Sequence, residues 1–139
     1  MDSLQSDVWQ RSVSSCVLDA SAVLAVLKGE PGGLVVLSSG LASQISTVNL
    51  AEVYGRLINL GMQGSPAWEA AHTVADEIVL YTQEHARLTA ELLPRTRALG
   101  LGIGDRACLA LAIERKLPVL TADKAWKALR VGVEVRVIR

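Results

Sequence analysis

Short, continuous apolar runs alternate along this chain with longer segments whose apolar residues recur at helical spacing. Continuous apolar runs are typical of strands that are buried on both faces of a parallel sheet. Strands that alternate with helices form such a sheet, and the helices cover its two faces. The pattern therefore predicts an α/β fold.

Five strands are predicted. The first four are short apolar runs. The fifth alternates Val with Gly132, Glu134 and Arg136, a period of two that suits an edge strand with one wet face. The four runs are CVLD (16–19), SQIS (43–46), EIVLY (77–81) and PVLT (118–121).

The segments between the strands carry helix start and stop signals. Thr47 is expected to cap a helix over 48–60, and Pro94 to kink a long amphipathic helix over 84–99. The GEPGG segment (29–33) lacks the Lys-Ser/Thr of a phosphate-binding loop and is expected to be a turn. The other predicted helices cover 20–28, 67–76 after Ser65-Pro66, 105–115 and 123–129.

Length and charge narrow the class of protein. The chain has 139 residues, the size of one domain. Its 14 basic and 14 acidic residues balance, which argues against a protein that holds nucleic acid by charge alone. The balance does not exclude a nuclease that gains positive charge from metal ions. Cys16 and Cys108 stand in apolar runs and are expected to be reduced core residues.

The N-terminal segment is polar and lacks the apolar stretch of a secretion signal. No later segment has the ~18 consecutive apolar residues of a membrane span. We therefore expect a cytoplasmic protein that does not enter a membrane. Residues 1–14 are expected to be a poorly ordered tail before one domain over 15–139.

Acidic residues fall at the points where predicted strands end or helices begin. In open α/β sheets, ligands bind at the carboxyl ends of the strands, where the loops converge. Glu52 is the most informative acid, because it lies in the second turn of a helix whose cap Thr47 already supplies. The acids are Asp19, Glu52, Asp105 and Asp123.

Each acid also has a local explanation, since Asp is a favoured helix cap and Glu52 has Arg56 one turn away. Four such coincidences at one edge of one sheet explain the pattern less well than a shared site. Two carboxylates ~4 Å apart repel by about 4 kcal/mol at an effective dielectric constant near 20, so a raised pKa or a divalent cation must offset the repulsion. Oxygen ligands without His or Cys favour Mg²⁺ or Mn²⁺, and such sites often serve phosphoryl chemistry.

Four segments carry these acids: VLDASAVLAVL, STVNLAEV, GLGIGDRACLALA and PVLTADKAW. In order and spacing they resemble the motifs of PIN-domain ribonucleases, and most closely those of VapC toxins of VapBC toxin–antitoxin pairs. The resemblance covers residues 16–139 and implies a three-layer fold with a five-stranded parallel sheet. It also implies an Mg²⁺- or Mn²⁺-dependent endoribonuclease that cuts structured RNA (tRNA or rRNA), forms a homodimer and is restrained by a VapB-like antitoxin.

The resemblance further implies a role for each acid. Asp19 and Asp105 would be the firmest metal ligands, while Glu52 and Asp123 would bind a second ion or act through water. Attack by water in line with the scissile bond would leave a 5′-phosphate and a 3′-hydroxyl. The auxiliary candidates are Ser21, Asn49 and Thr121.

Other polar and aromatic residues near the motifs have weaker signals. His72 and His85 have no partner at ligand spacing and are expected at the surface. Trp68 and Trp126 are expected to pack within helix faces. The basic candidates for contacts to RNA phosphates are Arg56, Arg106 and Lys124.

Alternative functions share part of this pattern. A PIN nuclease for RNA processing without an antitoxin, or an inactive PIN binding module, would carry the same motifs. A phosphoacceptor protein of the receiver or haloacid-dehalogenase type also has an Asp after its first strand, but Asp19-Ala-Ser21 lacks the further acids of both. Gly102 stands where many relatives have Ser, which removes a hydroxyl near the site.

Overall fold

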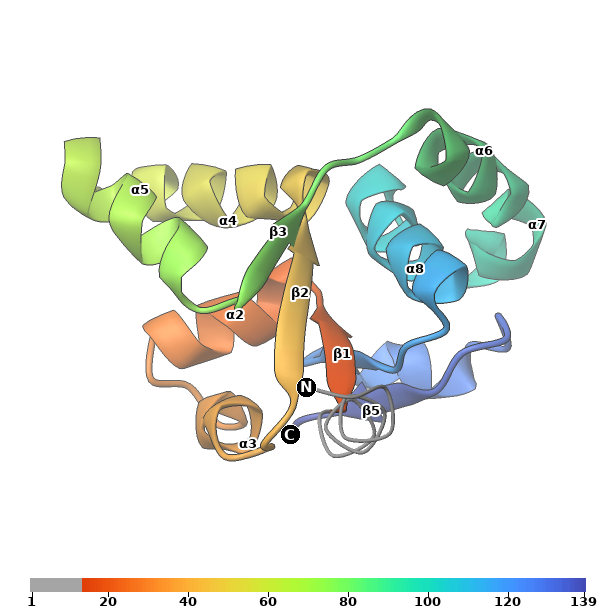
Figure 1. Cartoon of the computed structure of the whole chain (residues 1–139), viewed down its shortest axis with the longest axis horizontal. Helices are drawn as coiled ribbons and strands as arrows, with labels where there is room; N and C mark the ends of the chain where they lie inside the picture. The colour runs from red at the N-terminus through yellow and green to blue at the C-terminus, as the bar shows by residue number, and fades with distance from the viewer. Residues whose placement is uncertain (1–13) are drawn as a thin grey trace, which may run out of the picture.

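The computed structural model describes residues 14–139, and in this range five parallel strands form a single sheet in the order β3-β2-β1-β4-β5 (Figure 1). The central strand, β1, is hydrogen-bonded to β2 on one side and to β4 on the other. The predicted fold class is confirmed. The strands are β1 (Ser15–Leu18), β2 (Ala42–Ser46), β3 (Glu77–Val79), β4 (Val119–Thr121) and β5 (Val135–Val137).

Helices connect the strands. In the described range they are α2 (Ala20–Leu27), α3 (Gly33–Leu37), α4 (Thr47–Asn59), α5 (Gly64–Thr73), α6 (Gln83–Glu91), α7 (Leu93–Thr96) and α8 (Ile103–Arg115), with two short 3₁₀ helices, η1 (Arg97–Leu99) and η2 (Lys124–Ala128).

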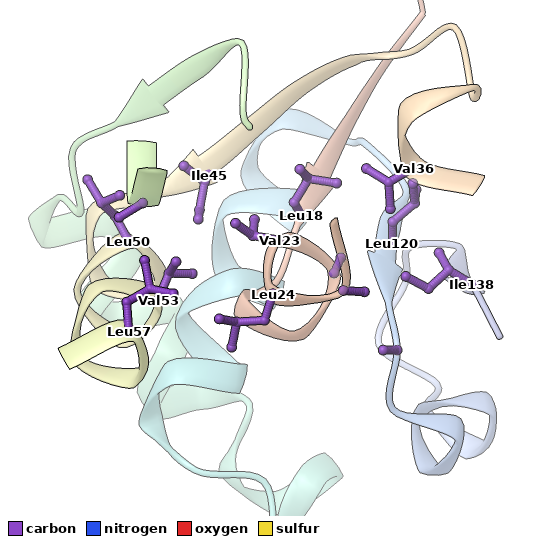
Figure 2. Close-up of a cluster of buried hydrophobic side chains, with 14 of the residues drawn as sticks. Leu18, Val23, Leu24, Val36, Ile45, Leu50, Val53, Leu57, Leu120 and Ile138 are labelled. Carbon is purple, nitrogen blue, oxygen red and sulfur yellow. The ribbon is translucent and has the colours of Figure 1, made fainter. Parts of the chain in front are cut away.

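The helices cover both faces of the sheet, because successive strand residues point to opposite sides. On one face, Leu18 and Leu120 pack with α2, α3, α4 and α5 (Figure 2). On the other face, Val17 and Val119 pack with α8 and η2, and α6 packs against α8 (Figure 1). The three-layer arrangement agrees with the expectation from the motifs.

The predicted tail, residues 1–14, lies outside the described residues except for Ser14. The carbonyl oxygen of Ser14 accepts a hydrogen bond from the backbone N–H of Ala42 (2.8 Å), which extends the pairing of β1 with β2. Between residues 14 and 139, none of the helices combines the length and the apolar character that crossing a membrane requires.

Two helix starts differ from the prediction. α8 begins at Ile103, so Asp105 occupies its third position rather than its cap. Ser46, not Thr47, caps α4: the Ser46 hydroxyl accepts a hydrogen bond from the backbone N–H of Val48 (3.2 Å). Both helices start one or two residues earlier than predicted, since Thr47 in α4, and Ile103 and Gly104 in α8, are also helical.

Three other element boundaries also differ. The helix predicted over 84–99 is divided into α6, α7 and η1, because Pro94 lacks the N–H that a continuous helix requires. β3 ends at Val79, two residues before the predicted end. The turn over 29–33 leads directly into α3, a helix of 5 residues that the sequence pattern did not predict.

Two expectations about aromatic side chains were wrong. His85 is buried between α6 and α8, with 1% of its surface exposed, because its ring finds a partner in Glu114. Trp68 on α5 packs edge-on against Tyr54 of α4, with ring centroids 5.2 Å apart, but 42% of its surface is exposed, so it does not lie in the core. Trp126 is buried, as predicted.

Candidate active site

The candidate site lies at the carboxyl edge of the sheet, where β1 and β4 end next to each other. The chain order reverses at this point: β2 and β3 lie on one side of β1, and β4 and β5 on the other. Such a reversal is the usual ligand position in open α/β sheets. Asp19 directly follows β1, and Asp123 lies two residues beyond the end of β4 at Thr121.

Asp19 is the most deeply buried of the four acids, at 4% exposed. Its carboxylate accepts hydrogen bonds from the backbone N–H of Ala22 (2.8 Å) and from the hydroxyls of Ser21 (2.7 Å) and Thr121 (2.5 Å). The bond from Ala22 caps α2. Burial raises the pKa of Asp19 to about 6, although the three hydrogen bonds act in the opposite direction. Asp19 is thus a helix cap and a firmly oriented carboxylate at once.

Asp105 connects the acids electrostatically. Burial raises the pKa of Asp19, Glu52 and Asp105, and the charges of neighbouring acids raise it further. The charge of Asp105 acts on both Asp19 and Glu52, and the charge of Asp123 acts on Asp105. Asp105 also accepts a hydrogen bond from the backbone N–H of Gly102 (3.2 Å), which closes the first turn of α8. The four acids therefore form one electrostatic cluster.

Glu52 reaches the cluster from α4. Asn49, which is buried, donates from Nδ2 to Glu52 Oε1 (2.7 Å) and to the backbone carbonyl oxygen of Gly104 (2.9 Å). Because Gly104 precedes Asp105, this contact joins the Glu52 carboxylate to the first turn of α8. Glu52 is exposed to solvent as a whole, but its carboxylate lies against Gly104.

Asp123 lies at the exposed rim of the site. Its Oδ1 accepts a hydrogen bond from the backbone N–H of Ala125 (3.0 Å) and caps η2, which is the local explanation that the sequence allowed for this acid. Asp123 borders an open hollow of about 450 Å³, together with Ser21, Lys124 and Arg139. Acidic and basic side chains meet in this hollow, so it offers oxygen ligands and cationic donors side by side.

The three basic candidates differ in their surroundings. Arg56 is exposed on α4, one turn beyond Glu52, and Lys124 is exposed next to Asp123. Arg106 is only partly exposed, and its Nη1 donates to the backbone carbonyl oxygen of Thr89 on α6 (2.9 Å). Arg106 therefore supports the packing of α8 on α6, whereas the side chains of Arg56 and Lys124 are exposed to solvent.

The donors in the site suit a hard divalent cation. Within residues 14–139, no three His, Cys, Asp or Glu side chains are arranged so that they could hold a metal ion together. Mg²⁺, however, keeps several waters and is usually bound through one or two carboxylates. Asp19 and Asp105 supply that number. A cation would offset the burial, and to a smaller extent the repulsion from Asp105, that raise the pKa of Asp19.

Comparison with protein-family models matches residues 16–132 to the PIN domain, a range that contains all four acids. The chain belongs to the PIN-domain family. The family expected from the motifs is thereby confirmed. Comparison with curated proteins finds no match.

Solved structures with toxin–antitoxin names share the fold. A toxin–antitoxin complex from Klebsiella pneumoniae has a TM-score of 0.71 at 17% identity, covering 90% of this chain and 98% of that chain. VapC20 from Mycobacterium tuberculosis, described as a sarcin-ricin loop cleaving toxin, has a TM-score of 0.66 at 18% identity, covering 84% and 98%. VapBC2 from Rickettsia felis, bound to a DNA fragment from its promoter, has a TM-score of 0.65 at 16% identity, covering 88% and 98%. At these identities the likeness shows a common fold.

Two residues at the site were not predicted from the sequence. Gly104 allows Glu52 to approach α8 closely. The sequence feature that could have indicated it is a glycine in the first turn of a helix, where alanine is more favourable. Arg139 reaches the hollow beside Asp123 from the segment after β5, and no local pattern marks it.

Proposed function

We propose that this chain is a VapC-like toxin, an Mg²⁺-dependent endoribonuclease that cuts structured RNA and is neutralised by a VapB-like antitoxin. The observation that carries the proposal is the coupling of four acids through Asp105 at the carboxyl edge of the sheet. A cluster of carboxylates repels a polyanion, so its use in RNA cleavage requires divalent cations. The names of the structural relatives, which include toxin–antitoxin complexes and a sarcin-ricin loop cleaving toxin, support the same function.

In this proposal Asp19 and Asp105 would hold the metal ion, and Glu52 and Asp123 would hold a second ion or a water molecule. A divalent cation bound there would polarise the scissile phosphodiester and lower the pKa of the attacking water. Glu52, whose pKa is raised by burial, accepts the proton of that water. Water would attack phosphorus in line with its bond to the 3′-oxygen. As that bond breaks, the 3′-oxygen would take a proton from solvent, so the products carry a 5′-phosphate and a 3′-hydroxyl.

Hydroxyl groups keep the deepest acid in place during this reaction. The Ser21 hydroxyl donates to one oxygen of Asp19, and the Thr121 hydroxyl donates to the other. The backbone N–H of Ala122 donates in turn to Ser21 Oγ (2.9 Å). Because Oδ1 accepts two hydrogen bonds and Oδ2 accepts one, Asp19 presents the remaining lone pair of Oδ2 in one fixed direction.

Basic residues on the two sides of the cluster account for RNA binding by a chain without net charge. Lys124 and Arg139 border the hollow beside Asp123, and Arg56 lies on the other side, beyond Glu52. We assign these three side chains to backbone phosphates on either side of the scissile bond. Arg106 contributes less, since its guanidinium already donates to Thr89.

Exposed apolar side chains support a protein partner. α3 exposes 79% of Leu34 and 63% of Leu37, next to a hollow of about 350 Å³ that Ala25 and Val26 also line. Exposed apolar patches of this kind mark protein interfaces. A VapB-like antitoxin, and a second copy of this chain in a homodimer, are the partners that we propose. Co-expression with a neighbouring antitoxin gene should relieve toxicity, whereas an RNA-processing nuclease would need no such partner.

The test is cleavage of purified total tRNA and rRNA by the purified protein in Mg²⁺, in Mn²⁺ and in chelator. Asp19→Asn and Asp105→Asn variants are assayed beside wild type, and Glu91→Gln, an exposed acid on α6 that pairs with Arg87, is the matched control. We expect discrete fragments from wild type and from the control only when metal is present. Fragments that persist in chelator, or that both Asp variants produce at the wild-type rate, would contradict the proposal.

A further inference from the structure

Glu52 differs from the other acids in what holds it. Asp19 and Asp123 accept hydrogen bonds that cap their own helices, and Asp105 closes the first turn of α8. Glu52 is instead held by Asn49, one turn earlier on α4, and the same Asn49 amide also donates to the backbone of α8 at Gly104. Its position therefore depends on residues other than the acids themselves.

The amide of Asn49 has one possible orientation. Its Nδ2 lies 2.7 Å from Glu52 Oε1 and 2.9 Å from the carbonyl oxygen of Gly104, and both partners can only accept. The nitrogen must therefore face these two oxygens. The other end of the amide, Oδ1, is buried and has no hydrogen-bond partner among the residues that the structure describes.

An unpartnered oxygen makes Asn49 a poor choice for packing alone. Asn49 is 1% exposed, and an apolar side chain of similar size would fill the space without leaving a buried acceptor unsatisfied. The gain that offsets this penalty is the pair of bonds from Nδ2. These bonds draw the Glu52 carboxylate toward the carbonyl group of Gly104.

Gly104 provides the space for this approach. Its backbone is helical, a conformation that any residue adopts, so no positive φ demands glycine there. A Cβ at this position would lie 2.5 Å from the carboxyl carbon of Glu52, and closer still to both oxygens. Alanine would otherwise favour the helix. The glycine is thus explained by the acid that lies against it.

We propose that Asn49 and Gly104 are positioning residues for Glu52. Asn49 draws the carboxylate to α8, and Gly104 leaves room for it beside Asp105. Together they set the separation between Glu52 and Asp105, and therefore the geometry in which the two acids act on metal and water. The inference rests on the proposed nuclease function.

The first test is Gly104→Ala, because this substitution should stabilise the helix and at the same time weaken the site. The three atoms nearest the added Cβ all lie at the end of the flexible Glu52 side chain, so the Glu52 carboxylate is expected to retreat by about 1 Å to reach ordinary contact distance. The variant should fold with an unchanged or higher melting temperature. A displacement of this size predicts RNA cleavage slower by roughly 10- to 100-fold. Mn²⁺ binding, followed by calorimetry, should weaken as well.

The matched control is Gly55→Ala, a helical glycine on α4. A Cβ at Gly55 meets no atom of the described chain within 4 Å, so this variant gains the same helix preference without touching Glu52. It should cleave RNA and bind Mn²⁺ as wild type does.

Double variants separate positioning from general packing. Asn49→Leu removes both donated bonds and should lower the Mn²⁺ affinity in the same way as Gly104→Ala. When Glu52→Gln is already present, neither substitution should change the Mn²⁺ affinity further, because each acts through the carboxylate. Residues with a merely structural role would keep their full effect in that background.

Two results would overturn the inference: a Gly104→Ala protein with the Mn²⁺ affinity of Gly55→Ala, or a loss that persists undiminished in the Glu52→Gln background. A wild-type protein that shows no metal-dependent RNA cleavage would contradict the proposed function instead. In that case the calorimetric comparison of Gly104→Ala with Gly55→Ala still decides whether the two residues position Glu52.

Discussion

The two ends of α8 treat an acid in opposite ways. Near the C-terminal end, Glu114 lies 2.7 Å from Nε2 of the buried His85 on α6. Near the N-terminal end, Asp105 meets the charges of Asp19 and Glu52, which are also acids. Glu114 pairs with a side chain of the fold, whereas Asp105 lies among other acids, with the charge of the adjacent Arg106 acting in the opposite direction. This difference indicates that Glu114 contributes to packing, whereas Asp105 is available to bind a ligand.

The pairing at the C-terminal end is complete on both sides of the imidazole. The backbone N–H of Thr82 donates to Nδ1 of His85 (3.2 Å), so the ring proton resides on Nε2 and is donated to Glu114. Thr82 and His85 also form the capping box at the start of α6. His85 thereby joins α6 to α8 and fixes the first turn of its own helix, with every polar atom of the ring in use.

The largest expected effect is a difference in RNA cleavage rate between variants of Asp105 and Glu114. Asp105→Asn should slow RNA cleavage by more than about 100-fold, because it removes a proposed metal ligand and the hub of the acidic cluster. Glu114→Gln keeps an acceptor for His85 and should leave the cleavage rate within about twofold of wild type. Initial rates on one tRNA substrate at saturating Mg²⁺ measure both, and equal rates for the two variants would remove the distinction between the ends of α8.

The next effect is on stability and pH. The pKa of Asp19 is about 6 in the folded chain against 3.8 ordinarily, so the fold favours the protonated form. Without metal, that contribution is fully present below about pH 4 and is lost as the pH rises to about 6, by at most about 3 kcal/mol. The raised pKa values of Glu52 and Asp105 act in the same direction.

Chemical denaturation in chelator at pH values from 4 to 8 measures this loss. Asp19→Asn should flatten the profile, and at pH 8 the variant should be more stable than wild type, since Asn still caps α2 but carries no buried charge. Mg²⁺ should restore stability to wild type only. A wild-type profile that the substitution leaves unchanged would show that Asp19 is not the group responsible.

A smaller effect is expected at the other end of α8. His85→Leu should lower the free energy of unfolding by about 1–3 kcal/mol, because it leaves Glu114 and the Thr82 N–H without their partner. Its effect on metal binding should be negligible. Urea denaturation gives the first quantity and Mn²⁺ titration the second, and a marked loss of Mn²⁺ affinity would show that the two ends of the helix are coupled.

The smallest effect concerns RNA phosphates. Lys124→Ala should raise the KM for RNA by about threefold and reduce its dependence on salt, since one phosphate contact is lost. Lys127→Ala, a lysine on the same 3₁₀ helix that does not border the hollow beside Asp123, is the control. If both variants respond equally, the RNA does not pass through that hollow.

The positions of several candidate site residues were predictable, because these acids stand next to strand ends and helix starts that the sequence pattern marks. Asp19 follows a buried apolar run and caps the next helix, so its position at the carboxyl edge could be inferred from the strand pattern alone. Asp123 follows β4 in the same way. The grouping of four acids was predictable only in combination, since each has an adequate local explanation.

The contacts that could not be predicted join distant segments. His85 and Glu114 are 29 positions apart, and His85 was expected at the surface because it has no partner at ligand spacing. Its burial depends on how α6 packs on α8. Asn49 and Gly104 are 55 positions apart, and their contact depends on how α4 approaches α8. The helix pattern indicates which face of each element is apolar but not which atoms of two elements meet.

The central claim is that the acids around Asp105 form a metal site, and calorimetric titration of Mn²⁺ into the purified protein at neutral pH tests it most directly. We predict saturable binding to wild type and to Glu114→Gln, and none to Asp105→Asn. A wild-type protein that binds no Mn²⁺, or an Asp105→Asn protein that binds it as tightly as wild type, would contradict the account.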